Sequence, residues 1–199
     1  MIGYDISEFQ GIGVGLGGDF VIIRAGNGRR RDFNAGGHIG AAKGRGLRWS
    51  LYLYCEPGNN SPEYQADLMC GVARDFGMPQ GRKMYADIEE GGGDLRWYRD
   101  RFSSRVSFNG YVAVTRVYSG ESFGQVHGVF TGVDDWVANY GPNNGRMNTP
   151  PRIAWAIWQY TSIPIDTNTA SAESIARIFD GVPSAPLRPP FVEDMLLYG

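Results

Sequence analysis

The stretch MYADIEEG, residues 84–91, sets the plan of this chain. Its first three residues predict a short buried strand, which leads into acidic positions and then a run of glycines. Because side chains alternate along a strand, residues two apart face the same side, and we expect Asp87 and Glu89 to point the same way. Two residues of strand rise about 6.6 Å, which sets the expected offset of the two carboxylates.

Two carboxylates at this spacing are typical of sites that cleave glycosidic bonds. Like charge and partial burial both penalise ionisation, so the less solvated acid stays protonated near neutral pH and can act as a general acid. The Asp-x-Glu pattern alone has a plainer explanation, because acidic residues often end a strand or begin a helix in contact with solvent. The catalytic interpretation therefore depends on the rest of the chain.

Length and composition indicate one globular domain. The 199 residues are enough to bury a sizeable core, and the net charge of −2 provides no basic field for nucleic acid. No stretch is long and apolar enough to span a membrane, and the opening MIGYDIS lacks the features of a signal peptide. Cys55 and Cys70 have no metal-site spacing, and we expect Cys70 to be a buried free thiol in a helix.

Apolar patterning predicts strands alternating with helices at first, and mainly strands later. The expected strands cover residues 2–6, 19–26, 47–54, 84–86, 110–118, 135–140, 153–160 and 163–166. The expected helices cover residues 34–46, 61–76, 94–102, 121–129 and 172–179. Ser61 followed by Pro62 is a strong helix start, because serine caps the first turn and proline suits the first helical position.

Apolar strands without alternation are typical of parallel strands buried on both faces. With the helices they predict an α/β fold, a TIM-like parallel barrel with an incomplete ring of helices, in a single domain. Functional residues of such barrels gather at the C-terminal ends of the strands. Polar residues fall at these ends repeatedly, which indicates one shared cleft: Asp5, Arg24, Tyr54, Asp87 with Glu89, Tyr118, Tyr140 and Gln159.

In series, these segments resemble glycoside hydrolase family 25, the lysozymes of phages and bacteria typified by the Chalaropsis-type muramidase. GYDISEFQG (3–11) resembles the family's G-x-D-x-S-x-x-Q-G, and ADIEEG (86–91) resembles its catalytic Asp-x-Glu strand. DWVANYG (135–141) resembles its W-x-A-x-Y strand. Three further strands of the family are similar to the stretches VIIRAG (21–26), GLRWSLYLY (46–54) and WQYTS (158–162) of this chain. The resemblance covers roughly residues 2–181.

The resemblance implies a flattened barrel of the (β/α)5(β)3 type over residues 1–182. It implies cleavage of the β-1,4 bond between N-acetylmuramic acid and N-acetylglucosamine in peptidoglycan, without metal or cofactor. By motif position, Glu89 would be the general acid, Asp87 its partner carboxylate, Asp5 a supporting acid and Asp166 the last acid of the cleft. The proline-rich sequence that follows predicts a linker and short tail over residues 183–199.

The sequence departs from the family's pattern at three places, one of which is Leu53, where a His or an aromatic residue is frequent after the tyrosine. Phe9 stands where the family usually has tryptophan. Only five residues separate Tyr160 from Asp166, where the family usually has a longer hairpin.

Candidates for substrate binding are the larger polar and aromatic residues near the strand ends. They are Arg24, Tyr52, Tyr54, Tyr118, Trp136, Tyr140, Gln159 and Tyr160. The rings can equally be ordinary core, and Arg24 can equally pair with a carboxylate. Tyr140 and Tyr160 lie at solvent ends of strands, so we favour these two, with Gln159, as sugar contacts. His38 and His127 fall in helices away from the strand ends, so no Ser-His or Cys-His set is visible.

Two functions from different classes stay open, a muramidase and a non-catalytic peptidoglycan-binding or virion-associated wall-binding protein. The intact acid pair favours the enzyme, because a pure binder gains little from two costly acids. A wall amidase or peptidase is disfavoured by the missing zinc or nucleophile set. Because both acids come from one strand, we expect a retaining, substrate-assisted reaction.

The expected partner is the glycan strand of peptidoglycan, bound by a monomer that takes no nucleic acid and has no membrane span. The opening without a signal peptide suits a phage endolysin. Such a protein is made in the host cytoplasm and acts on the cell wall after release. A virion component would suit it as well.

Overall fold

The computed structural model describes residues 1–111, 116–132 and 134–180. Residues 183–199 lie outside this part of the chain, so the linker and tail stay a prediction. None of the helices in the described residues is long and apolar enough to cross a membrane. Cys55 and Cys70 are both buried free thiols, as predicted for Cys70.

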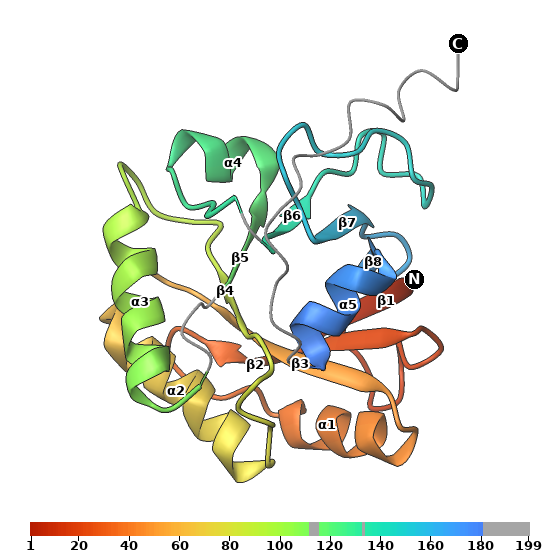
Figure 1. The fold of residues 1–199 in the computed structure, drawn as a ribbon, viewed down its shortest axis with the longest axis horizontal. Coiled ribbons are helices and arrows are strands. Elements are labelled where there is room, and N and C mark those ends of the chain that lie inside the picture. Colours follow the sequence, from red (N-terminus) through yellow and green to blue (C-terminus); the bar gives the residue numbers. More distant parts are fainter. Residues whose placement is uncertain (112–115, 133, 181–199) are drawn as a thin grey trace.

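Eight strands close into one barrel in the order of the chain (Figure 1). The strands are β1 (Ile2–Ile6), β2 (Phe20–Asn27), β3 (Arg48–Tyr54), β4 (Tyr85–Asp87), β5 (Arg116–Gly120), β6 (Trp136–Ala138), β7 (Ile157–Thr161) and β8 (Thr167–Ala170). Neighbours from β1 to β7 are parallel, and β8 runs antiparallel to both β7 and β1. The predicted barrel is therefore confirmed, with its last strand reversed.

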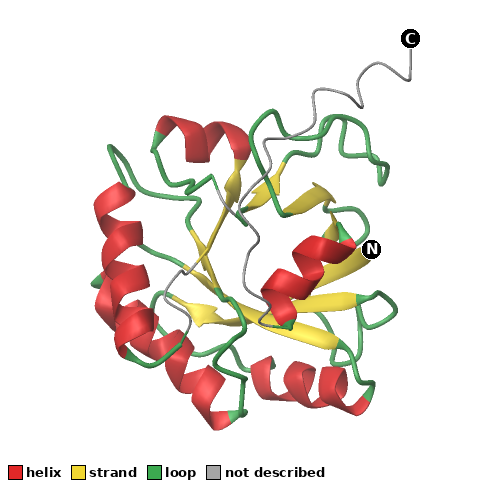
Figure 2. Ribbon diagram, in the orientation of Figure 1, coloured by secondary structure: helices red, strands yellow, loops and turns green. Residues whose placement is uncertain are grey.

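Helices cover only part of the barrel wall, as expected (Figure 2). They are α1 (Ala35–Gly44), α2 (Pro62–Asp75), α3 (Arg96–Phe108), α4 (Glu121–Val126) and α5 (Ala172–Phe179). Serine caps two of them: the Ser61 hydroxyl accepts the Tyr64 N–H at 3.2 Å, and the Ser171 hydroxyl accepts the Ser174 N–H at 3.0 Å. Loops surround the side of the barrel near β6 and β7.

Two apolar clusters hold the fold. Outward-facing strand residues such as Leu51 and Leu53 pack against the surrounding helices. The second cluster fills the barrel interior, where Trp136 contacts the rings of Tyr52, Tyr85 and Tyr118, and it extends to residues of α5. The ring centroids of Phe20 and Phe179 lie 5.4 Å apart. α5 thus closes the end of the barrel opposite the C-terminal ends of the parallel strands, and those ends are left open.

The strand predicted over residues 163–166 is wrong, because β8 begins at Thr167. Residues 163–166 instead form the turn between β7 and β8, in which Pro164 has no N–H to give to a strand ladder. Other element ends shift by up to six residues, as at α3, which ends at Phe108. Residues 112–115 of the strand predicted over 110–118 lie outside the described residues. The fourth strand ends at Asp87, before Glu89.

Candidate active site

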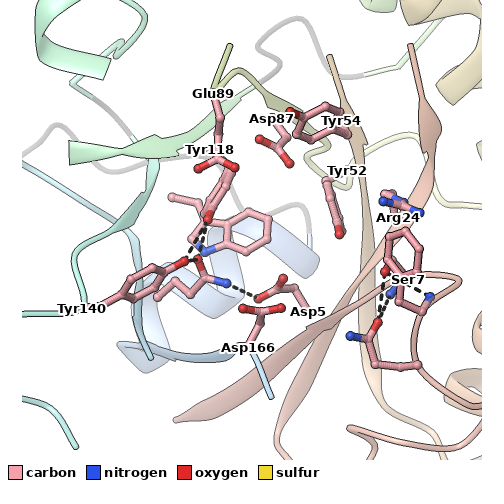
Figure 3. A pocket seen from close by; sticks show the side chains of 14 residues that line it. Asp5, Ser7, Arg24, Tyr52, Tyr54, Asp87, Glu89, Tyr118, Tyr140 and Asp166 are labelled. Atoms are coloured by element: carbon pink, nitrogen blue, oxygen red, sulfur yellow. Dashed lines mark hydrogen bonds between the residues drawn. The ribbon is translucent and has the colours of Figure 1, made fainter. Parts of the chain in front are cut away.

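Four carboxyl groups meet at the open end of the barrel, in a hollow of about 270 Å³ (Figure 3). All the predicted site residues except Tyr160 line it: Asp5, Arg24, Tyr52, Tyr54, Asp87, Glu89, Tyr118, Trp136, Tyr140, Gln159 and Asp166. Ser7, Phe9 and Gln10 complete the lining. The residues come from seven different strands or the loops that follow them.

Alternation along each strand selects which residues face the hollow. In β4, Tyr85 and Asp87 face the barrel interior and Ala86 faces the helices. In β3, Tyr52 and Tyr54 face inward while the leucines between and before them face outward. The last inward-facing residue of each strand lies at the open end of the barrel, which is why the polar side chains of the site are found there.

Glu89 does not belong to the strand that carries Asp87, so their separation is not set by strand rise. The segment after the strand stays tied to β5. The Ile88 N–H donates to the Tyr118 carbonyl at 3.0 Å, and the Ser119 hydroxyl donates to the Ile88 carbonyl at 2.8 Å. Ile88 is fully buried, which turns Glu89 back over the hollow.

Asp5 is held by two side-chain amides. Nε2 of Gln159 donates to Oδ2 of Asp5 at 3.0 Å, and Nδ2 of Asn168 donates to the same oxygen at 2.8 Å. Asn168 is itself fixed, because Nε1 of Trp136 donates to its Oδ1 at 2.7 Å. This places Asn168, which we did not predict as a site residue, directly behind the acid of the first strand.

Two tyrosine hydroxyls fix the other end of Gln159. Tyr140 donates to Oε1 of Gln159 at 2.8 Å, and Tyr118 donates to the same oxygen. A chain of hydrogen bonds therefore runs from the tyrosines through Gln159 to Asp5 (Figure 3).

The pKa values of all four carboxyl groups are raised. Burial is the main cause for each, and it raises the pKa of Asp166 to about 6. Burial and the nearby Glu89 raise the pKa of Asp87 well above its usual value. Burial and Asp166 do the same for the pKa of Asp5, against the hydrogen bonds from its two amides. Burial raises the pKa of Glu89, although hydrogen bonds from other groups act in the opposite direction. The hollow can therefore hold protons that isolated carboxylates would have lost.

Arg24 pairs with carboxylates, as the alternative to a sugar contact predicted, and it also lines the hollow. Its guanidinium pairs with Asp32 at 2.8 Å and with Glu8 at 3.1 Å. Tyr54 lines the hollow and donates its hydroxyl to Glu90 at 3.1 Å.

Tyr160 is placed away from the hollow. Gln159 faces the interior of β7, so its neighbour in the strand faces outward, where the Tyr160 ring lies 5.8 Å from that of Trp158. Tyr160 therefore does not line the hollow, in contrast to the prediction that it contacts the sugar. Ser7, Phe9 and Gln10 were quoted in the opening motif without being assigned to the site; they lie in the turn after β1, where no periodicity predicts direction.

A second hollow, of about 410 Å³, adjoins the first. The two share Glu89 and Tyr140, and the second is otherwise lined by Gly120, Glu121, Ser122, Phe123, Ala138, Asn139 and Gly141. Glu89 thus stands between two spaces, each open to solvent. Among the residues that the structure describes, no group of three or more His, Cys, Asp or Glu side chains is arranged to hold a metal ion.

Comparison of structures finds the same fold in lysozymes and endolysins. The catalytic domain of the endolysin Ply40, from bacteriophage P40 of Listeria monocytogenes, superposes with a TM-score of 0.78 and 25% identity, covering 92% of this chain and 98% of that one. The lysozyme of Streptomyces coelicolor gives 0.69 and 19%, covering 92% and 98%. The modular autolysin LytC of Streptococcus pneumoniae, in complex with a synthetic peptidoglycan ligand, gives 0.65 and 20%, covering 84% and 46%.

Sequence comparison places the chain in the same group. No curated protein matches it. The sequence model of the glycosyl hydrolases family 25 matches residues 4–168. This range includes all four acids of the hollow. With that match over most of its length, the chain belongs to glycosyl hydrolases family 25.

Proposed function

We propose that this glycoside hydrolase is a lysozyme that cleaves the β-1,4 bond between N-acetylmuramic acid and N-acetylglucosamine in peptidoglycan. Glu89 is the general acid. Its raised pKa keeps a proton available near neutral pH. Its place between the two hollows allows one sugar to bind on each side of the bond that it protonates.

The observation that carries the mechanism is the environment of Asp87. Its Oδ1 is buried and accepts no hydrogen bond from any residue that the structure describes. A buried carboxylate oxygen without a donor is costly, and a ligand that brings an N–H group would satisfy it. The 2-acetamido group of a bound muramic acid carries such an N–H. Donation to Asp87 would also lower its pKa and favour the carboxylate form.

The reaction then proceeds in two steps with retention of configuration. The acetamido oxygen attacks the anomeric carbon, the glycosidic C–O bond breaks, and Glu89 gives its proton to the leaving oxygen. Asp87 accepts the acetamido N–H and stabilises the positive charge of the cyclic oxazolinium intermediate. Water opens this ring while the Glu89 carboxylate takes its proton. Asp5 and Asp166 add negative potential beneath the cationic transition state.

The relatives support this substrate. LytC is described in complex with a synthetic peptidoglycan ligand, and Ply40 is a phage endolysin. By analogy, we propose that the chain acts as a monomer on the bacterial cell wall, as an endolysin or a virion-associated enzyme.

The activity is tested by digesting purified peptidoglycan and analysing the soluble fragments by mass spectrometry after reduction. New reducing ends at muramic acid are expected. Glu89→Gln should lose roughly two to four orders of magnitude in rate, while its neighbour Glu90→Gln serves as a matched control and keeps most of it. Binding to the wall without any new reducing ends would instead support the non-catalytic binder.

The role of Asp87 needs a different substrate. De-N-acetylated peptidoglycan should resist cleavage, because it lacks the attacking oxygen. Asp87→Asn should lose rate without a sugar ester ever forming on residue 87. Trapping a fluorinated sugar covalently on Asp87, or finding de-N-acetylated chains cleaved at the normal rate, would overturn the substrate-assisted step.

A further inference from the structure

An exposed aromatic ring stands at the end of the catalytic hollow away from Glu89. Phe9 lines the hollow, yet 80% of it is exposed to solvent. In Figure 3, Arg24 and Ser7, with which Phe9 shares this wall, lie across the hollow from Glu89 and Tyr140. An exposed large apolar side chain is most informative where it adjoins a binding site.

Charged groups hold the Phe9 ring in place. The Arg24 guanidinium lies 4.9 Å from the ring centroid. That guanidinium is fixed in turn by Asp32 at 2.8 Å and Glu8 at 3.1 Å, and the Glu8 N–H donates to Asp32 at 2.8 Å. One face of the ring is therefore supported by a cation, and the exposed surface stays available.

The same arrangement recurs at Phe33, on the loop that follows β2. Phe33 is 82% exposed, and the Arg30 guanidinium lies 4.4 Å from its ring centroid. Arg30 donates to both oxygens of Glu8, at 2.7 and 2.8 Å. The two arginines that support the two rings thus share the carboxylate of Glu8, which joins both rings into one braced unit.

We propose that Phe9 and Phe33 form a sugar-binding platform that extends the catalytic hollow along the glycan strand. A pyranose ring presents a face of C–H groups, which packs on an aromatic ring and removes apolar surface from water. Because the two rings lie against guanidinium groups that ion pairs hold in place, little conformational freedom is lost when a sugar binds.

The side of the cleft on which this platform lies follows from Glu89, and this step rests on the proposed function. The leaving sugar occupies the second hollow, beyond Glu89 and Tyr140. The muramic acid occupies the first hollow, beside Asp87. Phe9 lies across that hollow, so it contacts the sugar that precedes this muramic acid, and Phe33 contacts a sugar further along the same side.

The test measures binding of peptide-free glycan fragments of defined length, by titration calorimetry, to protein that carries Glu89→Gln and so leaves the ligand intact. Phe9→Ala should weaken binding of a hexasaccharide about tenfold, which corresponds to about 1.4 kcal/mol. Phe33→Ala should weaken it less, and should have no effect on a disaccharide.

Phe108 offers a matched control. It is 77% exposed, and the Arg105 guanidinium lies 4.7 Å from its ring centroid. It ends α3, which returns from β4 to the opposite end of the barrel. Phe108→Ala should therefore leave binding unchanged. Hexasaccharide affinity that is the same in Phe9→Ala and Phe108→Ala would overturn the platform, as would a loss seen only when stem peptides are attached.

The two proposals fail in different ways. If the unmodified protein releases no muramic acid reducing ends, the proposed function fails, while the binding comparison still reports on the platform. If those ends form but Phe9→Ala binds as tightly as its parent, only the platform fails. Equal melting temperatures of the variants exclude an effect of misfolding.

Discussion

Gln159 donates a 3.0 Å hydrogen bond to Asp5 across the barrel, joining the seventh strand to the first. The amide is oriented by two tyrosine hydroxyls, because both Tyr118 and Tyr140 donate to its oxygen. Only its nitrogen is therefore left to face Asp5. Because the Gln159 amide can only donate to Asp5, it favours the ionised form of Asp5, whereas burial raises the pKa of Asp5.

Gln159→Glu should reverse this effect. The new side chain keeps an acceptor for the tyrosines but places a second carboxylate beside Asp5, so the pair retains a proton to higher pH. We expect kcat/KM at pH 7 to fall by roughly one to two orders of magnitude, with a smaller loss at acid pH. The pH profile of kcat/KM measures both.

Asn168→Asp provides an independent check of the same relationship. It keeps the acceptor for Trp136 and removes the other donor to Asp5. A shift of the pH profile in the same direction is expected. Unchanged profiles in both variants, at unchanged melting temperatures, would mean that the ionisation of Asp5 has no part in the reaction.

Asp166 should cost stability at neutral pH. Its pKa is about 6 in the folded protein and near 3.9 when unfolded. The folded state therefore binds more protons between these values, and stability falls as the pH rises through this window. Asp166→Asn should gain about 1–2 kcal/mol above pH 6, after allowance for screening by solvent, and nothing at pH 4 or below. Chemical denaturation at several pH values measures the gain.

Asp134 should behave in the opposite way. Burial alone would raise its pKa, but the hydrogen bond from Lys83 and the charges of Lys83 and Arg177 outweigh burial and lower it. Its stabilising effect is thus present above the unfolded pKa near 4 and lost as the pH falls through the lowered folded value. Asp134→Asn leaves the buried cations Lys83 and Arg116 without their carboxylate and removes one of the two acidic partners of Arg177. Asparagine tolerates the φ of 56° at this position.

The expected loss for Asp134→Asn is roughly 3 kcal/mol at pH 7, or a Tm lower by about 6–12 °C. Asp94→Asn is the control, because Asp94 pairs with Arg96 at the exposed surface. Equal melting temperatures for the two variants would contradict a structural role for the buried cluster.

Much of the candidate site could be predicted because it follows from local rules. Asp5, Arg24 and Asp87 lie at or near the C-terminal end of a buried strand, and a parallel barrel brings such ends together. The same alternation rule excluded Tyr160 once Gln159 faced inward, so that error came from favouring solvent exposure over strand register.

Other parts depend on contacts that no local pattern encodes. Asn168 reaches Asp5 because β8 runs antiparallel to β1 and pairs Gly3 with Asn168. The amphipathic pattern of α5 predicts that Ile175 and Ile178 are buried, but not that they close the barrel interior. The direction of the Phe9 side chain depends on its contact with Arg24, which lies in a different element, β2.

The last prediction concerns Gly26, which lies in β2 where the pairing with β3 shifts register. A Cβ here would meet the Arg30 carbonyl oxygen and, at 2.8 Å, a methyl group of Leu68. The carbonyl belongs to backbone that accepts the Asn27 N–H at 3.0 Å, so it cannot move aside without opening the loop that leads to Phe33. Gly26→Ala should therefore lower the free energy of unfolding by roughly 1–3 kcal/mol.

Gly40→Ala is the matched control for this substitution. Gly40 lies in α1, and an added Cβ would meet no atom within 4 Å. Alanine there should raise the free energy of unfolding by about 0.5–1 kcal/mol, because it restricts the unfolded chain and favours the helix. Urea denaturation of both variants measures the contrast. Gly26→Ala should also weaken hexasaccharide binding, because the loop that it disturbs carries Phe33 and Asp32. A Gly26→Ala protein as stable as the Gly40→Ala protein would show that the close approach of Gly26 to the Arg30 carbonyl does not hold the loop.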